Sequence, residues 1–156
     1  MEENLGSPAA VPDLRIQPPA EDATLRDWLH VHNAVIPTHH LSLDEARDRA
    51  VRHILGVGYV EGSLVGCSTV RPPTDDSRTA TVIARVLVAH RGQGCGERLY
   101  AQALSEARGL GATSVETVVL ASNEDGLRFA LKHGFVETQR YVLPGESVPW
   151  IVLRLS

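Results

Sequence analysis

The 156-residue sequence is poor in cysteine, in aromatic residues and in long apolar segments. Its two cysteines, Cys67 and Cys95, make neither a disulfide framework nor a zinc site. No apolar run approaches the roughly 20 residues that a transmembrane helix needs. The N-terminus also lacks the basic segment and apolar core of a signal peptide. These absences predict a cytoplasmic protein that binds no metal and does not span a membrane.

Basic residues are also fewer than acidic ones, with 15 Lys and Arg against 19 Asp and Glu, so the formal net charge is −4. Such a balance gives no general electrostatic attraction to nucleic acid or to anionic lipid, so neither partner is expected. A hydrophobic content of 43% with 22% charged residues is ordinary for a soluble globular domain. We expect a loose polar tail over residues 1–12 and a single domain over residues 13–156.

Hydrophobic periodicity predicts alternating strands and helices without an internal repeat. Pro37 is expected to end the first helix. Ser42 and Glu45 form a capping box that starts the second helix, and Gly62-Ser63 indicates a tight hairpin. The expected strands cover 14–16, 58–61, 64–70, 79–86, 113–120, 135–143 and 149–155; the expected helices cover 20–36, 43–54, 97–108 and 125–133.

A glycine-rich segment, Arg91-Gly92-Gln93-Gly94-Cys95-Gly96, connects the fourth expected strand to the third expected helix. Glycines let a backbone approach a ligand closely, and a helix start offers unpaired N–H groups and a positive dipole end. Arg91 adds a fixed positive charge. The segment therefore predicts a pyrophosphate-binding loop, with an unliganded tight turn as the alternative. Its spacing fits neither the dinucleotide fingerprint nor the P-loop.

The segment does match the pattern [RQ]-x-x-G-x-[GA], and it resembles the acetyl-CoA pyrophosphate loop of the GNAT superfamily of N-acetyltransferases. The order of the expected elements also resembles the GNAT fold along the whole chain after the tail. This resemblance implies a mixed α/β fold: a twisted, mostly antiparallel sheet of about seven strands, four helices, and a splay between strands 4 and 5. It further implies that acetyl-CoA enters this splay and that Ala84, Arg85 and Val86 contact its pantetheine arm.

The segment from Asn123 to Phe135 resembles the second GNAT signature, which implies that Asn123 holds the loop against the cofactor arm. Capping of the following helix is the alternative role. Many catalytic GNAT members place a tyrosine in this helix to protonate the departing CoA thiolate. The matching residue here is Ala130, which cannot donate a proton. The usual general acid is therefore missing.

The usual general base is missing too, because the strand over 79–86 contains no acidic residue. Glu61, Glu116 and Tyr141 remain as weak candidates for proton transfer, and a solvated strand position is the simpler explanation for each. Orientation of the reactants and polarisation of the thioester by strand N–H groups could still accelerate the reaction.

Four further residues have competing interpretations. Arg85 could bind a substrate carboxylate, or it could occupy an edge position with its charge in solvent. His39 and His40 could contact substrate, transfer protons or belong to an ordinary polar loop, and adjacent histidines alone have poor spacing for a metal. The Cys95 thiol could be activated by the helix start, or it could serve only as a small apolar side chain.

The predicted function is acetyl-CoA-dependent acetylation of a primary amine, on a small molecule or a peptide, by direct attack in a ternary complex. The alternative is a GNAT-fold module that binds acyl-CoA and has little transferase activity. The net negative charge favours a neutral or cationic amine, and the resemblance makes a homodimer plausible. A protein-interaction domain that has lost CoA is disfavoured by the intact glycine loop.

Overall fold

The computed structural model describes residues 13–155, so the tail expected over residues 1–12 lies outside the described residues. Seven strands form one sheet in the order β1-β2-β3-β4-β5-β7-β6. All neighbouring strands are antiparallel except β4 and β5, which are parallel. The elements, with two short 3-10 turns, are β1 Leu14–Gln17, α1 Asp22–Val35, η2 Pro37–His39, α2 Leu43–Arg52, β2 Ile54–Val60, β3 Ser63–Arg71, β4 Thr79–Val86, η3 Val88–His90, α3 Cys95–Gly109, β5 Ser114–Leu120, α4 Glu124–Lys132, β6 Phe135–Tyr141 and β7 Trp150–Leu155.

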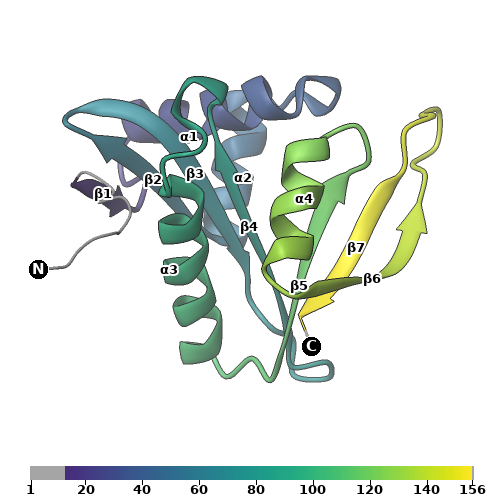
Figure 1. Ribbon diagram of the computed structural model, residues 1–156. Helices are drawn as coiled ribbons and strands as arrows, with labels where there is room; N and C mark the ends of the chain where they lie inside the picture. The colour runs from purple at the N-terminus through teal and green to yellow at the C-terminus, as the bar shows by residue number, and fades with distance from the viewer. Residues whose placement is uncertain (1–12, 156) are drawn as a thin grey trace, which may run out of the picture.

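The helices cover both faces of the sheet: α3 and α4 lie on the near face in Figure 1, and α1 and α2 lie behind it. Helix α3 lies close to β3 and β4 because its inward positions are small, with Ala103 and Ala107 packed against Val82. On the opposite face, Trp28 of α1 packs over Cys67 of β3. None of the described helices is both long and apolar enough to cross a bilayer.

Strands β4 and β5 separate after a short parallel contact. Their register contains only three residue pairs, Thr79 with Ser114, Ala80 with Val115 and Thr81 with Glu116. Beyond Thr81 the two strands diverge, as Figure 1 shows. The splayed, seven-stranded α/β fold expected from the sequence is therefore confirmed.

The local start and stop signals are mostly confirmed, but the expected start of β2 and the expected position of the β2–β3 turn are wrong. Ser42 Oγ accepts the Glu45 N–H at 3.1 Å and Glu45 Oε1 accepts the Ser42 N–H at 2.8 Å, which is the expected capping box. Strand β2 begins at Ile54 instead of residue 58, since it pairs with β3 along its whole length. The turn that follows is centred on Glu61 and Gly62, with φ of 50° and 80°, one residue earlier than expected.

Candidate functional site

A cleft of about 460 Å³ occupies the gap between β4 and β5. One wall is formed by residues 82–86 of β4 and the other by residues 117–120 of β5. Its far end reaches the glycine loop before α3 and the first turns of α4. The splay of the two strands therefore opens onto the predicted pyrophosphate loop, so that one continuous cavity connects them.

The glycine loop ends at a helix start whose backbone donors are free. Gly92 and Gly94 have φ of 77° and 85°, a left-handed conformation that favours glycine. Gly94 caps α3, and the Arg98 N–H makes the first bond to its carbonyl at 3.2 Å. Among the described residues, none from 92 to 97 donates a backbone hydrogen bond. The loop therefore offers several N–H groups to an anion.

The backbone of β4 also presents donors to the cleft. The Leu87 N–H donates to the Val65 carbonyl on β3 at 2.9 Å. Successive N–H groups point to alternate sides of a strand. The N–H groups of Ala84 and Val86 therefore point away from β3, toward the cleft. This is the strand edge that β5 leaves unpaired after Thr81.

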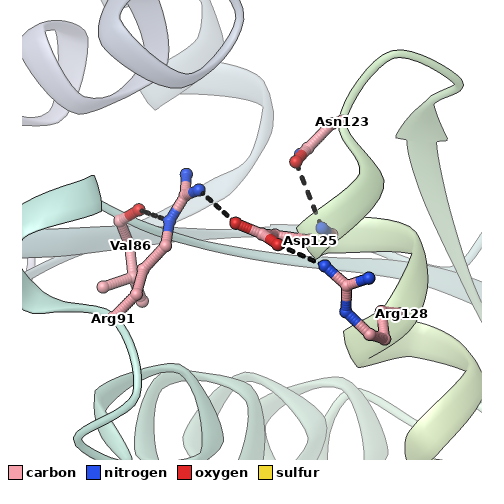
Figure 2. Close-up of polar contacts among 6 residues, drawn as sticks. Val86, Arg91, Asn123, Asp125 and Arg128 are labelled. Carbon is pink, nitrogen blue, oxygen red and sulfur yellow. Dashed lines mark hydrogen bonds and ion pairs between the residues drawn. The ribbon is translucent and has the colours of Figure 1, made fainter.

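Arg91 bridges the mouth of the cleft, as Figure 2 shows. Its Nε donates to the Val86 carbonyl at 2.9 Å, and a terminal nitrogen donates to Asp125 at 2.9 Å. Arg128 donates to the other oxygen of Asp125 at 2.6 Å. Hydrogen bonds from Arg128 and Arg91 hold the pKa of this carboxyl below its usual range. The positive charge of Arg91, which was expected to contact a pyrophosphate, is thus partly neutralised by the carboxylate of Asp125, 34 residues away in the sequence.

Asn123 caps α4, because its Oδ1 accepts the Gly126 N–H at 3.1 Å (Figure 2). The same residue lines the cleft. A Cβ at Gly126 would lie 2.6 Å from the Asn123 amide nitrogen, so a larger residue there would displace the capping side chain. The capping alternative is therefore confirmed, and the position beside the cleft is compatible with contact to a ligand as well.

Ala130, at the position of the usual tyrosine, lines the cleft and is 3% exposed. A tyrosine from the other helix, Tyr100 of α3, lines the same cleft. Its ring meets Phe129 and Phe135 edge to face, with centroids 5.9 and 5.8 Å apart. Burial raises the pKa of Tyr100, so its hydroxyl keeps its proton. Tyr100 was not selected from the sequence, because nothing local in α3 indicates which positions face α4.

Arg85 is a buried charge in the middle strand of the sheet. It is 9% exposed, and it lines the cleft from β4. The interpretation with the charge in solvent is therefore wrong, because the side chain is buried. Burial, with smaller contributions from Arg71 and Arg49, lowers the pKa of Arg85 from its usual value.

The sequence profile of the Acetyltransferase (GNAT) family matches residues 17–135, more than half of the chain. The chain belongs to this family. No curated protein sequence matches the chain significantly. Solved structures share the fold. A protein named "putative phosphinothricin N-acetyltransferase" superposes with a TM-score of 0.75 at 23% identity, covering 92% of this chain and 98% of its own.

Two further GNAT neighbours superpose over a similar length. The N-acetyltransferase from Staphylococcus aureus Mu50 has a TM-score of 0.72 at 18% identity, covering 92% of this chain and 98% of its own. The protein yncA from Salmonella typhimurium, solved with its cofactor acetyl-CoA, has a TM-score of 0.71 at 18% identity, covering 92% and 93%. At these identities the likeness establishes the fold of this GNAT domain and nothing finer.

The two histidines considered for substrate contact lie outside the cleft of this GNAT domain. His39 in η2 pairs with Glu146 at 3.0 Å and meets the Trp150 ring at a tilt of 62°. Its carbonyl accepts a bond from His32 Nε2 at 3.0 Å. His40 is exposed. The described residues contain no group of three or more possible metal ligands.

The remaining candidates are also placed away from the cleft of this GNAT domain. Glu61 occupies the β2–β3 turn, and Glu116 of β5 pairs with Arg154 at 2.8 Å. Tyr141 ends β6 opposite Trp150 and is 36% exposed. Cys95 is buried against Leu99, and burial raises the pKa of its thiol. The last observation favours the small apolar role over a reactive one.

Proposed function

We propose that this protein transfers the acetyl group of acetyl-CoA to a primary amine by direct attack in a ternary complex. The observation that carries the proposal is the continuity of the cleft, from the free N–H groups before α3 to the split between β4 and β5. Such a cavity suits a ligand with an anionic group at one end and an extended, strand-like arm. Acetyl-CoA supplies the activated acyl group.

Different residues of the chain would bind different parts of acetyl-CoA. Residues 91–96 would hold the pyrophosphate through backbone N–H groups and Arg91, with Asn123 beside the arm. The N–H groups of Ala84 and Val86 would pair with the pantetheine and polarise the thioester carbonyl. Tyr100, the one of the three tyrosines that lines the cleft, would give its proton to the sulfur as the C–S bond breaks, and the proton lost by the attacking amine would pass to solvent and restore the tyrosine.

A second candidate function is the binding of acyl-CoA without turnover. Two observations favour it: Ala130 replaces the usual tyrosine of α4, and β4 carries no acidic side chain. Both affect proton transfer and neither affects the loop, so cofactor binding is expected under either function. The two functions therefore differ only in whether thiol is released when an amine is present.

The test combines calorimetric titration of acetyl-CoA with measurement of thiol release against a panel of amines. Binding with amine-dependent release supports the transferase, whereas binding without release on any amine supports the binding module. A Gly94→Ala variant should weaken acetyl-CoA binding at least about tenfold, because alanine disfavours the left-handed loop conformation. Gly111→Ala, at a φ of 90° and away from the cleft, imposes the same strain and is the matched control. Equal affinities of the two variants would contradict the loop assignment.

A further inference from the structure

The side chain of Arg85 leaves β4 on the face opposite α3. Its neighbours Ala84 and Val86 pack against Cys95 and Leu99 of α3. Because side chains alternate along a strand, Arg85 points to the other face, which α1 and α2 cover. Its partner in the β3 register is Cys67, which packs beneath α1. The guanidinium therefore lies on the side of the cleft remote from the pyrophosphate loop.

Among the groups that act on Arg85, the buried Cys67 thiol favours its charge and the neighbouring basic side chains oppose it. Arg71 of β3 and Arg49 of α2 oppose its charge, and Arg85 in turn opposes the protonation of His32 of α1. Within residues 13–155, Arg85 makes no hydrogen bond or ion pair with another side chain. The Nε atom of Arg71 is buried, and it too has no hydrogen-bond partner in that range.

The carboxylates on the surrounding elements are engaged with other groups. They are Asp22 with Arg47 at 2.9 Å, Asp27 with the Tyr59 hydroxyl at 2.6 Å, Asp44 with Arg47 at 2.8 Å, Glu45 with the Ser42 N–H at 2.8 Å, Asp48 with Arg52 at 2.7 Å, Glu116 with Arg154 at 2.8 Å, and Glu146 with His39 at 3.0 Å. A buried cation without a counterion is costly, and a protein retains one where a ligand supplies the opposite charge. The described chain provides no such counterion for Arg85.

We propose that Arg85 binds the carboxylate of an acceptor that carries both a primary amine and a carboxylate, that is, an amino acid. This inference rests on the proposed transferase function. The planar guanidinium can hold a carboxylate through two parallel hydrogen bonds, which fixes the orientation of the molecule as well as its charge. Because Arg85 is adjacent to the Ala84 and Val86 N–H groups, a carboxylate held there leaves the amine close to the thioester.

The proposal reverses the expectation drawn from the net charge. A chain of net charge −4 favours a neutral or cationic amine, if the charge is averaged over the whole surface. The local charge at the acceptor side of the cleft has the opposite sign, because the buried Arg85 lines the cleft there. Polyamines are therefore expected to be poor acceptors.

The experiment compares each common amino acid with its own carboxamide, which keeps the shape and removes the negative charge. Binding to the CoA-loaded protein is measured by calorimetry, and acetyl transfer by thiol release. At least one free acid should be preferred over its carboxamide by about 100-fold or more. Arg85→Gln should abolish this preference and keep the affinity for CoA. Arg15→Gln, in the exposed edge strand β1, is the matched control and should retain the preference.

A second variant distinguishes the loss of carboxylate binding from a failure to fold. Arg85→Met removes an unpaired buried cation, so its melting temperature should equal or exceed that of the wild type. Equal binding of acid and carboxamide, no binding of any acid, or a preference that survives in Arg85→Gln would each overturn the inference. With CoA binding intact, these results leave the proposed function standing. Failure to bind acetyl-CoA would instead overturn the proposed function.

Discussion

Asp125 places a negative charge at the mouth of a cleft that is proposed to receive a pyrophosphate. Its two oxygens accept hydrogen bonds from Arg91 and Arg128 (Figure 2). The carboxylate thus competes with an incoming phosphate for the same guanidinium groups. Since all three side chains lie near the surface, the exchange of one anion for another is expected to be easy and sensitive to salt.

Replacement of this carboxylate should therefore tighten the binding of acetyl-CoA. We expect Asp125→Asn to raise the affinity about threefold at low salt, and less at high salt, because two arginines are released toward the phosphates. Calorimetric titration at two ionic strengths measures the effect. Asp48→Asn, which removes an arginine-paired carboxylate on α2, should leave the affinity unchanged. Weaker binding by Asp125→Asn would mean that the bridge positions the loop.

Tyr100 provides a second test at a single residue. Tyr100→Phe keeps the edge-to-face packing on Phe129 and Phe135 and removes only the hydroxyl. We expect kcat to fall at least about tenfold with the KM for acetyl-CoA unchanged, since the proton donor is lost. Tyr141→Phe tests the rival hydroxyl, which lies outside the cleft, and should retain activity. If Tyr141→Phe loses activity and Tyr100→Phe retains it, Tyr141 is the proton donor instead.

The close approach of α3 to the sheet depends on a glycine in β3. A Cβ at Gly66 would lie 2.5 Å from the Arg85 carbonyl oxygen and 2.8 Å from a Leu99 methyl group. The first of these is backbone and cannot rotate away. The same contact fixes the end of β4, from which the glycine loop begins.

Gly66→Ala should therefore lower the free energy of unfolding by about 1–3 kcal/mol. Gly109→Ala is the matched control, because a Cβ at this last residue of α3 meets nothing within 4 Å. That variant should be neutral or stabilising by up to about 1 kcal/mol. Denaturant unfolding of both proteins measures the difference. If both behave alike, the helix is free to move away from β3.

Elements whose limits depend on local chemistry could be predicted from the sequence. The capping box at Ser42 and the loop glycines are examples, since each is set by residues within a few positions. The start of β2 could not be predicted, because Ile54 and Leu55 continue the helical periodicity of α2 and only pairing with β3 selects a strand.

The candidate site was predictable in part for the same reason. The phosphate loop and the cap at Asn123 are local features. The bridge from Arg91 to Asp125 joins residues 34 apart, and the burial of Arg85 depends on the place of β4 in the sheet order. Both are set by tertiary structure. Tyr100 was missed because the orientation of α4 decides which positions of α3 face the cleft.

At the scale of the whole molecule, His32 on the acceptor side of the core makes the free energy of unfolding depend on pH in the acid range. Burial, assisted by Arg85, lowers the pKa of His32 to about 4. His32 in the unfolded chain binds a proton near the ordinary histidine pKa of 6.5, whereas in the folded protein its pKa is about 4. The contribution of His32 to the free energy of unfolding is therefore at its full value above pH 6.5 and declines as the pH falls toward 4.

We expect the decline to reach about 3 kcal/mol in the free energy of unfolding. Urea denaturation at several pH values between 7 and 4 measures it. His32→Gln should flatten the profile over that range, while His30→Gln, an exposed histidine on the same helix, should not. An unchanged slope in His32→Gln would show that other groups dominate acid unfolding.

The short contact between β4 and β5 has a consequence for cooperativity. The sheet consists of two parts, β1 to β4 and then β5, β7 and β6, whose strands meet in three residue pairs, and a core cluster that includes Val82 and Val115 spans both parts. A ligand arm paired with the free β4 edge would join the two parts along their open length. Amide hydrogen exchange should then slow on both sides of the gap together, because the bound cofactor adds contacts where the two parts are separate.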